Sequence, residues 1–335
     1  MNKELLHNNA REVVSRTILA ADESSGTIAK RFKTIGVEST PNINREYRLL
    51  LFQTPGIQKF VSGVILYDET MRQKTYDEQP IPQLLAQKGI APGIKVDAGT
   101  MLIPGSGTDT FTQGLDGLGK RLKEYKELGA VFAKWRAMIT IDKDLPKALT
   151  IDRNAHDLAL YASICQENGI VPIVEPEVLM DGAHSFADSM KVTANVLKSV
   201  FRRLEEYGVH FGGMILKPNM ITPDAKHLSE ADSNAVAIAT LDILRDTVPA
   251  DVPGIAFLSG GQSPEMATDN LNNINHLRNL YNGKYPWERI TASYGRALQG
   301  EALEKWRGQT QNIPAAQDIF IDRAEKVFKA SNGQL

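Results

Sequence analysis

The chain alternates short apolar runs with amphipathic segments along nearly its whole length. Eight runs rich in branched and aromatic residues recur at spacings of roughly thirty to forty-five residues, as strands do when helices connect them. Strand alternating with helix eight times is the pattern of a closed (β/α)₈ barrel, the TIM barrel. The runs cover residues 16–23, 62–69, 90–97, 130–136, 169–177, 212–218, 253–261 and 289–296.

The segments between the runs show the period and the end signals of helices. Residues Leu118, Leu122, Tyr125 and Leu128 share one predicted helical face ahead of Gly129. Apolar residues repeat over 158–164 before a glycine, and again from residue 235 until a proline at 249. Barrels of this class exceed about 250 residues as one domain. We therefore expect a single catalytic domain over residues 1–335, with a short helical segment from about residue 312.

Composition excludes several classes of function. A formal net charge of -2 provides no basic surface for nucleic acid. No apolar run approaches about 18 residues, and the first residues, MNKELLHNNAREVVSRT, lack the pattern of a signal peptide. Cys165 is the only cysteine, which fits a reducing compartment. We expect a cytoplasmic protein without nucleic-acid or membrane partners.

The histidines do not suggest a metal centre. None of the six stands in an H-x-H or H-x-x-x-H spacing, and none ends one of the eight runs. We therefore expect no metal and no cofactor. A metal-dependent mechanism remains the alternative only if ligands converge from distant segments.

One run ends in a way that asks for a chemical explanation. The sequence GGMILKP, residues 212–218, is apolar up to Lys217, although lysine is rarely buried without a partner. In such barrels reactive groups belong at the carboxyl ends of the strands. Lys95 and Lys134 also stand at strand ends. Polar residues at strand ends can simply mark the loops, but three lysines with several carboxylates at one rim favour a catalytic site.

A lysine amine attacks a carbonyl only in its neutral form, which apolar surroundings and a neighbouring ammonium favour. Met214, Ile215 and Leu216 precede Lys217 and provide such surroundings. The iminium that forms draws electrons from the adjacent carbon–carbon bond, and carboxylates must move protons in both directions. Glu175 and Asp22 are candidates for these transfers, while Lys134 fits either a catalytic role or a structural ion pair.

Two segments have the composition of phosphate-binding turns. Ser259, Gly260 and Gly261 follow a strand, and a helix with a Ser-Pro start comes directly after them. Gly295 and Arg296 end the eighth run, and the loops after strands seven and eight are the recurrent phosphate site of these barrels. A second cluster after the first run combines residues 24–27 with Lys30 and Arg31. Two such sites across one rim indicate a substrate phosphorylated at both ends.

These motifs together resemble class I fructose-1,6-bisphosphate aldolases. The segments ILAADESSGTIAKR, GIKVDAG, TQGLDGL, FAKWR, IVPIVEPE, LKPNM, FLSGGQS and SYGRALQ follow one another in the family's order, from about residue 16 to about residue 303. The resemblance implies reversible cleavage of fructose 1,6-bisphosphate to dihydroxyacetone phosphate and glyceraldehyde 3-phosphate, without a metal, in a homotetramer.

The resemblance also implies residue roles. Lys217 would form the Schiff base, Glu175 would be the acid and base in its formation, Asp22 would handle the C4 hydroxyl proton, and Lys134 would support the arrangement of charge. The C1 phosphate would be held by Ser259, Gly260, Gly261, Gly295 and Arg296, with Ser293 nearby; Thr27, Arg31 and Lys95 would serve the other phosphate, and Arg136 would lie close to the sugar.

Two departures from the family pattern bear on these roles. Thr27 stands where animal members have serine, so the hydroxyl is kept. Asn44 precedes Arg45 where those members have two arginines, which predicts one phosphate-side contact fewer. Two alternatives stay open: a sibling lyase or transferase acting on another phosphorylated sugar, and a catalytically silent barrel that serves as a scaffold. The scaffold hypothesis predicts damage to the lysine–carboxylate set, whereas the sequence keeps every member.

Overall fold

A ring of eight parallel strands forms the centre of the computed structural model, within the described residues 1–144, 146–281 and 283–335. The order around the ring is β1-β10-β9-β8-β7-β6-β3-β2, and β1 pairs with both β10 and β2, which closes it. The predicted (β/α)₈ barrel is confirmed. The barrel strands are β1 (Thr17–Ala21), β2 (Val61–Leu66), β3 (Ala91–Lys95), β6 (Phe132–Ile141), β7 (Val171–Gly182), β8 (Ile215–Leu216), β9 (Gly254–Phe257) and β10 (Arg289–Tyr294).

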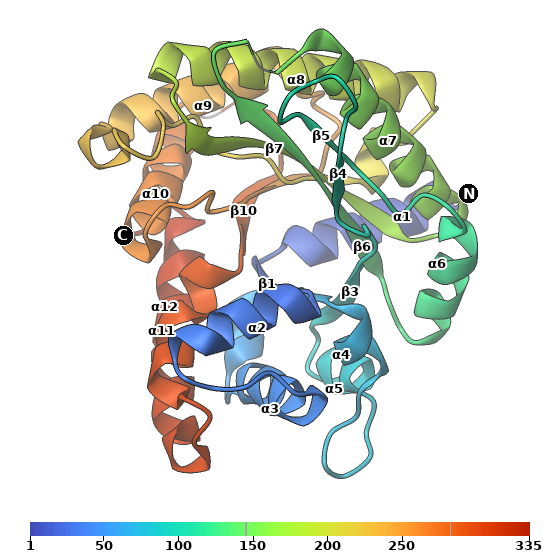
Figure 1. Ribbon diagram of the computed structural model, residues 1–335, viewed down its shortest axis with the longest axis vertical. Coiled ribbons are helices and arrows are strands. Elements are labelled where there is room, and N and C mark those ends of the chain that lie inside the picture. The colour runs from blue at the N-terminus through green and yellow to red at the C-terminus, as the bar shows by residue number, and fades with distance from the viewer. Residues whose placement is uncertain (145, 282) are drawn as a thin grey trace.

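Helices surround the ring, and α1 crosses behind it in the view of Figure 1. Their starts follow local sequence signals: Ser185 caps α8 in a capping box with Asp188, and Ser263 caps α10 ahead of Pro264. The helices are α1 (Lys3–Val14), α2 (Ser25–Thr34), α3 (Pro41–Phe52), α4 (Asp68–Arg72), α5 (Ile81–Gln87), α6 (Leu118–Glu127), α7 (Ala148–Glu167), α8 (Phe186–Glu206), α9 (Ser233–Thr247), α10 (Pro264–Leu280), α11 (Arg296–Trp306) and α12 (Ile313–Ala330).

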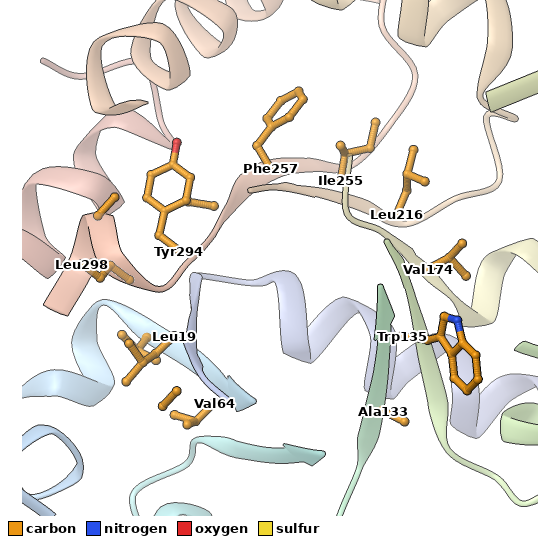
Figure 2. Close-up of a cluster of buried hydrophobic side chains, with 14 of the residues drawn as sticks. Leu19, Val64, Ala133, Trp135, Val174, Leu216, Ile255, Phe257, Tyr294 and Leu298 are labelled. Carbon is orange, nitrogen blue, oxygen red and sulfur yellow. The ribbon is translucent and has the colours of Figure 1, made fainter. Parts of the chain in front are cut away.

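The outer faces of the strands pack against the helices. Figure 2 shows Leu19, Phe257 and Tyr294 among the side chains of this outer core. Trp135 stacks on Tyr161 of α7 with ring centroids 5.5 Å apart. Side chains alternate along a strand, so the residues next to those packed against the helices point into the barrel. The strands are therefore apolar on both faces.

The inner core fills one end of the barrel and is closed there by α1. Phe132 lies so close to β3 that a Cβ on Gly93 would stand 2.2 Å from its ring. A Cβ on Gly213 would stand 2.8 Å from the Cβ of Leu6 on α1. Glycine in the FGG sequence is therefore explained by the close approach of α1. The strand also begins later than predicted: residues 211–213 form a 3₁₀ turn, and β8 is shorter than the predicted run.

Three other features differ from the sequence prediction. Strands β6 and β7 continue past the predicted ends at residues 136 and 177 and pair beyond the ring, as at Ile139 with Val178. A hairpin of β4 (Thr100–Leu102) and β5 (Thr110–Thr112) was not predicted, and its first strand is exposed to solvent. Leu128 does not share the buried face of α6: it is 36% exposed, because the helix ends at the residue before it.

Candidate active site

A cavity of about 830 Å³ opens at the carboxyl ends of the barrel strands. All fourteen site residues predicted from the sequence line it. They come from the barrel strands, from the loops that follow them, from α2 and from the start of α11, which the barrel brings to one rim. The fourteen are Asp22, Thr27, Arg31, Lys95, Lys134, Arg136, Glu175, Lys217, Ser259, Gly260, Gly261, Ser293, Gly295 and Arg296.

Lys217 lies directly after β8 and is 4% exposed. Its backbone N–H donates to the carbonyl of Val174 at 2.8 Å, so parallel pairing with β7 fixes where the lysine leaves the strand. Its Nζ is 3.1 Å from Oε1 of Glu175. The amine is thus buried, held at the rim and next to a group that can exchange a proton with it.

Glu175 connects Lys217 to a second buried lysine. Its Oε2 is 3.3 Å from Nζ of Lys134, and that Nζ is 2.7 Å from Oδ2 of Asp22. Lys134 is therefore shared by carboxylates of two strands, and Asp97 is a third at 3.9 Å. The four residues form a row of alternating charge, Lys217–Glu175–Lys134–Asp22, across the mouth of the barrel.

Charge pairing outweighs burial in this row. Burial alone would lower the pKa of Lys134, but the carboxylates of Asp22 and Glu175 raise it well above its ordinary value. Burial would likewise raise the pKa of Asp22, and Lys134 and Lys217 instead bring it well below its usual range. The same two ammonium groups lower the pKa of Glu175 against the effect of its burial. In the unliganded site both carboxyls are therefore ionised and Lys134 is charged at neutral pH.

Two further ion pairs flank the row. Lys95 donates to the Asp97 side chain and, at 2.8 Å, to its carbonyl. Arg136 donates from Nε to Glu177 on the neighbouring strand, and Glu177 raises the pKa of Arg136 although its burial acts in the opposite sense. Asp97 and Glu177 stood at the predicted strand ends without an assigned role. Their contacts show that they neutralise cations of the site.

The loop after β9 has the geometry of an anion-binding turn. Gly260 and Gly261 both have positive φ, at 50° and 80°, a region that other residues rarely adopt. A Cβ on Gly261 would stand 2.7 Å from the sulfur of Met180, so the close packing of Met180 on this turn also favours glycine. The turn leads into the capped start of α10, where backbone amides and the helix dipole favour an anion.

The end of β10 adds a second set of donors on the same side. Ser293 is buried, and its Oγ has no hydrogen-bond partner among the described residues, which leaves it free for a ligand. Gly295 precedes α11, whose first residue is Arg296. Across the described part of the chain Arg296 has no carboxylate within 4 Å, unlike the arginine at 136. A positive group without a counter-ion suits a phosphate.

Thr27 and Arg31 lie on α2, which follows β1, the strand that pairs with β10 on one side and with β2 on the other. The hydroxyls of Ser24 and Thr27 are 3.1 Å apart at the start of this helix. Arg31 reaches toward the loop after β10, since its Nη2 would be 3.7 Å from a Cβ on Gly295. Its guanidinium therefore borders both predicted phosphate ends.

The described residues contain no group of three or more His, Cys, Asp and Glu side chains arranged to hold a metal ion. Within the same residues, no helix has the length and apolar character that crossing a membrane requires.

Comparison with known proteins identifies the family. Residues 5–335 match the model of fructose-bisphosphate aldolase class-I. The chain is 48% identical to the cytosolic fructose-bisphosphate aldolase 4 of Arabidopsis thaliana over 94% of this chain and 79% of that protein, and 47% identical to fructose-bisphosphate aldolase 2 of Caenorhabditis elegans over 99% and 90%. The chain belongs to the class I fructose-bisphosphate aldolase family. The resemblance seen in the motifs is thereby confirmed.

A solved structure agrees with the aldolase fold. The fructose-bisphosphate aldolase of Plasmodium falciparum, crystallised in complex with TRAP and a small-molecule inhibitor, superimposes with a TM-score of 0.95 at 47% identity. The match covers 99% of this chain and 95% of that chain. The barrel, and with it the placement of strand ends around the cavity, is therefore that of the aldolase family.

The structure of this aldolase shows the surroundings of Glu23, which the motifs did not suggest as a site residue, and of Asn44, which departs from the family pattern. Glu23 lines the cavity, yet its carboxylate points to buried groups of α3 and α11 as well as to α2. Asn44 is buried, donates to Oε1 of Glu69 at 3.0 Å and is not among the cavity-lining residues. This position therefore faces the interior between α3 and α4, not the phosphate ends.

Proposed function

We propose that this aldolase cleaves fructose 1,6-bisphosphate reversibly to dihydroxyacetone phosphate and glyceraldehyde 3-phosphate, through a Schiff base on Lys217, as a step of glycolysis and gluconeogenesis. The observation that carries the proposal is the 3.1 Å contact of the buried Lys217 amine with Glu175, in a cavity that the glycine turn after β9 and Arg296 also line. Names of the relatives support the same substrate.

The row of alternating charge suits the proton transfers of this reaction. Glu175 takes a proton from Lys217, the amine so freed adds to the C2 carbonyl, and Glu175 returns the proton as the carbinolamine loses water to give the iminium. Asp22 takes the C4 hydroxyl proton as the C3–C4 bond breaks, and the bonding electrons pass to the iminium to form an enamine. Protonation of the enamine and hydrolysis of the Schiff base then release dihydroxyacetone phosphate and restore the amine.

Lys134 would hold the two carboxylates apart and keep both ionised. It contacts Asp22 at 2.7 Å and Glu175 at 3.3 Å, so its charge stabilises each of them before the substrate enters.

The two phosphates would bind at opposite parts of the rim. We assign the C1 phosphate to the turns after β9 and β10 and the other phosphate to α2 and the end of β3, with Arg136 close to the sugar. The C1 set is Ser259, Gly260, Gly261, Ser293, Gly295 and Arg296, and the second set is Thr27, Arg31 and Lys95. We also propose a cytoplasmic, single-domain homotetramer that uses no metal.

A cleavage assay tests the proposal. Purified protein is incubated with fructose 1,6-bisphosphate, and the two triose phosphates are measured separately, with fructose 1-phosphate as a second substrate. Equal amounts of dihydroxyacetone phosphate and glyceraldehyde 3-phosphate are expected. A folded protein that converts neither sugar phosphate would contradict the proposal and favour the scaffold hypothesis.

A further inference from the structure

Two neighbouring carboxylates at the end of β1 point to different partners. Asp22 contacts Lys134 in the row of alternating charge. Glu23 points instead toward α2, α3 and α11, where its carboxylate is almost fully buried. A buried carboxylate needs charge partners and hydrogen bonds to remain ionised, so the groups around Glu23 indicate its purpose.

The Glu23 carboxylate binds donors from three helices. Its Oε1 accepts from Nη1 of Arg31 and, at 2.6 Å, from Nε2 of Gln299. Its Oε2 is 2.7 Å from Nη2 of Arg48. The position of the Arg31 guanidinium is therefore tied to α3 and α11 through a single carboxylate.

The far side of this cluster is rigid. The amide of Gln299 also donates to the carbonyl of Ala20 at 3.1 Å, and its Oε1 accepts from the Tyr47 hydroxyl at 3.1 Å. Burial, together with the charge of Glu23, raises the pKa of Tyr47 far above its ordinary value, so the phenol stays a donor. These two contacts fix the orientation of the Gln299 side-chain amide, so that its N–H₂ group donates to Glu23.

The charges in the cluster are unequal, and the surplus lies on the cavity side. Arg48 is 2% exposed, with no access to a ligand, whereas Arg31 lines the cavity. One carboxylate is shared by these two guanidinium groups. Because Arg48 is buried against Glu23, Arg31 is the guanidinium of the cluster that a ligand in the cavity can reach, with Nη2 next to the loop after β10.

We propose that Glu23 is the positioning residue of the phosphate site: with Arg48 and Gln299 behind it, it fixes the Arg31 guanidinium where it meets a phosphate of the substrate. A long arginine side chain loses rotamer freedom when it binds a ligand, and holding it beforehand removes that loss from binding. The inference rests on the proposed function, in which Arg31 contacts a substrate phosphate.

A double-mutant cycle tests the proposal. Glu23→Gln keeps the size of the side chain and removes its charge, and we expect it to raise KM for fructose 1,6-bisphosphate by about tenfold, with a smaller change in kcat. Arg31→Ala should raise KM at least as much. In the Arg31→Ala background, Glu23→Gln should add less than about twofold, because the residue that it positions is absent. Full additivity, or an unchanged KM in Glu23→Gln, would overturn the proposal.

Two more variants complete the test, one as a control and one as a replacement for Glu23→Gln. Glu69→Gln removes the charge of a carboxylate in the first turn of α4 that binds Asn44 and does not line the cavity; the KM of this variant should equal that of the wild type. If Glu23→Gln does not fold, Gln299→Met removes one donor to Glu23 and should raise KM by about threefold, again only when Arg31 is present. A KM that Gln299→Met leaves unchanged would then contradict the positioning role.

Binding without turnover separates this inference from the proposed function. A hexitol 1,6-bisphosphate carries two phosphates and no carbonyl, and its Kd can be measured by calorimetry for the same variants. Wild-type protein that cleaves no sugar phosphate would contradict the proposed function alone. The same cycle in Kd would still decide whether Glu23 positions Arg31, since a Kd equal in wild type and Glu23→Gln would overturn that role.

Discussion

The two ends of the barrel interior are built from the same strands but from opposite kinds of residue. At the end closed by α1, the inward side chains form an apolar core. Two residues further along the same strands, on the same face, stand the four members of the charged row. The pairs, apolar residue first, are Ala20 with Asp22, Phe132 with Lys134, Ile173 with Glu175, and Ile215 with Lys217.

This difference shows how one strand period serves both stability and chemistry. The apolar layer is a low-dielectric floor directly beneath the charged layer, so charges there interact more strongly than they would in water. Burying four ionisable groups costs stability unless each is paired, and here each has an opposite charge within 3.3 Å. Burial of apolar side chains at the closed end stabilises the fold and offsets the cost of burying charges at the open end.

The largest effect is expected at the charged end. Lys217→Met removes the amine to which we assign the Schiff base, and kcat should fall on the order of 10⁴-fold or more, with the melting temperature little changed. The matched control is Lys33→Met, an exposed lysine of α2 that does not line the cavity. A kcat above about one hundredth of the wild-type value would break the assignment.

A smaller loss is expected when the proton carrier is replaced. Glu175→Gln keeps the shape of the bridge between the two lysines and removes its basicity, so kcat should fall about 10²–10³-fold in steady-state assays. KM should change much less, because Glu175 binds neither phosphate. A loss in kcat below about tenfold would mean that another group moves the proton.

The closed end should respond in stability rather than in rate. Leu6→Ala on α1 removes a fully buried side chain next to Gly213, and the free energy of unfolding should fall by about 2–4 kcal/mol, with kcat per folded molecule unchanged. Leu5→Ala is the control on the same helix, since Leu5 is 44% exposed and its loss should cost under about 0.5 kcal/mol. Denaturant titration measures both. Equal effects of the two variants would show that α1 does not close the core.

Acid should reduce the contribution of the charged row to the free energy of unfolding. The pKa of Asp22 is lowered in the folded state, so its contribution to stability is present above its ordinary pKa of about 3.8 and is lost as the pH falls below that value. Lys134, whose pKa is raised, contributes below about 10.5 and loses this only at higher pH. Asp22→Asn should therefore flatten the fall in stability between about pH 4 and pH 2. A parallel curve for the variant and the wild type would contradict this.

The smallest change is expected from removing metal ions. Activity after dialysis against EDTA should change by no more than about a tenth, because the proposed electron sink is an iminium and not a metal. Adding Zn²⁺ or Mg²⁺ back should restore nothing. Loss of activity in EDTA that a metal ion reverses would favour the metal-dependent mechanism.

The barrel and its rim were predictable because both follow from short-range patterns. Apolar runs with polar ends indicate where Lys217 and Glu175 reach the rim, and parallel strands bring these positions together. Long-range packing left no such signal. Three features were missed for this reason: the contact of α1 with Gly213, the extended pairing of β6 with β7, and the buried Glu23–Arg48 pair. Each depends on contacts between separate segments, which no local period in the sequence indicates.

The most direct test of the central claim traps the covalent intermediate. The protein is mixed with dihydroxyacetone phosphate, reduced with borohydride and digested, and the modified peptide is located by mass spectrometry. The account predicts a stable adduct on Lys217 and none on the Lys217→Met variant. An adduct on Lys134 or Lys95 would keep the Schiff-base mechanism and refute the assignment of the nucleophile, whereas folded protein without any adduct would contradict the mechanism itself.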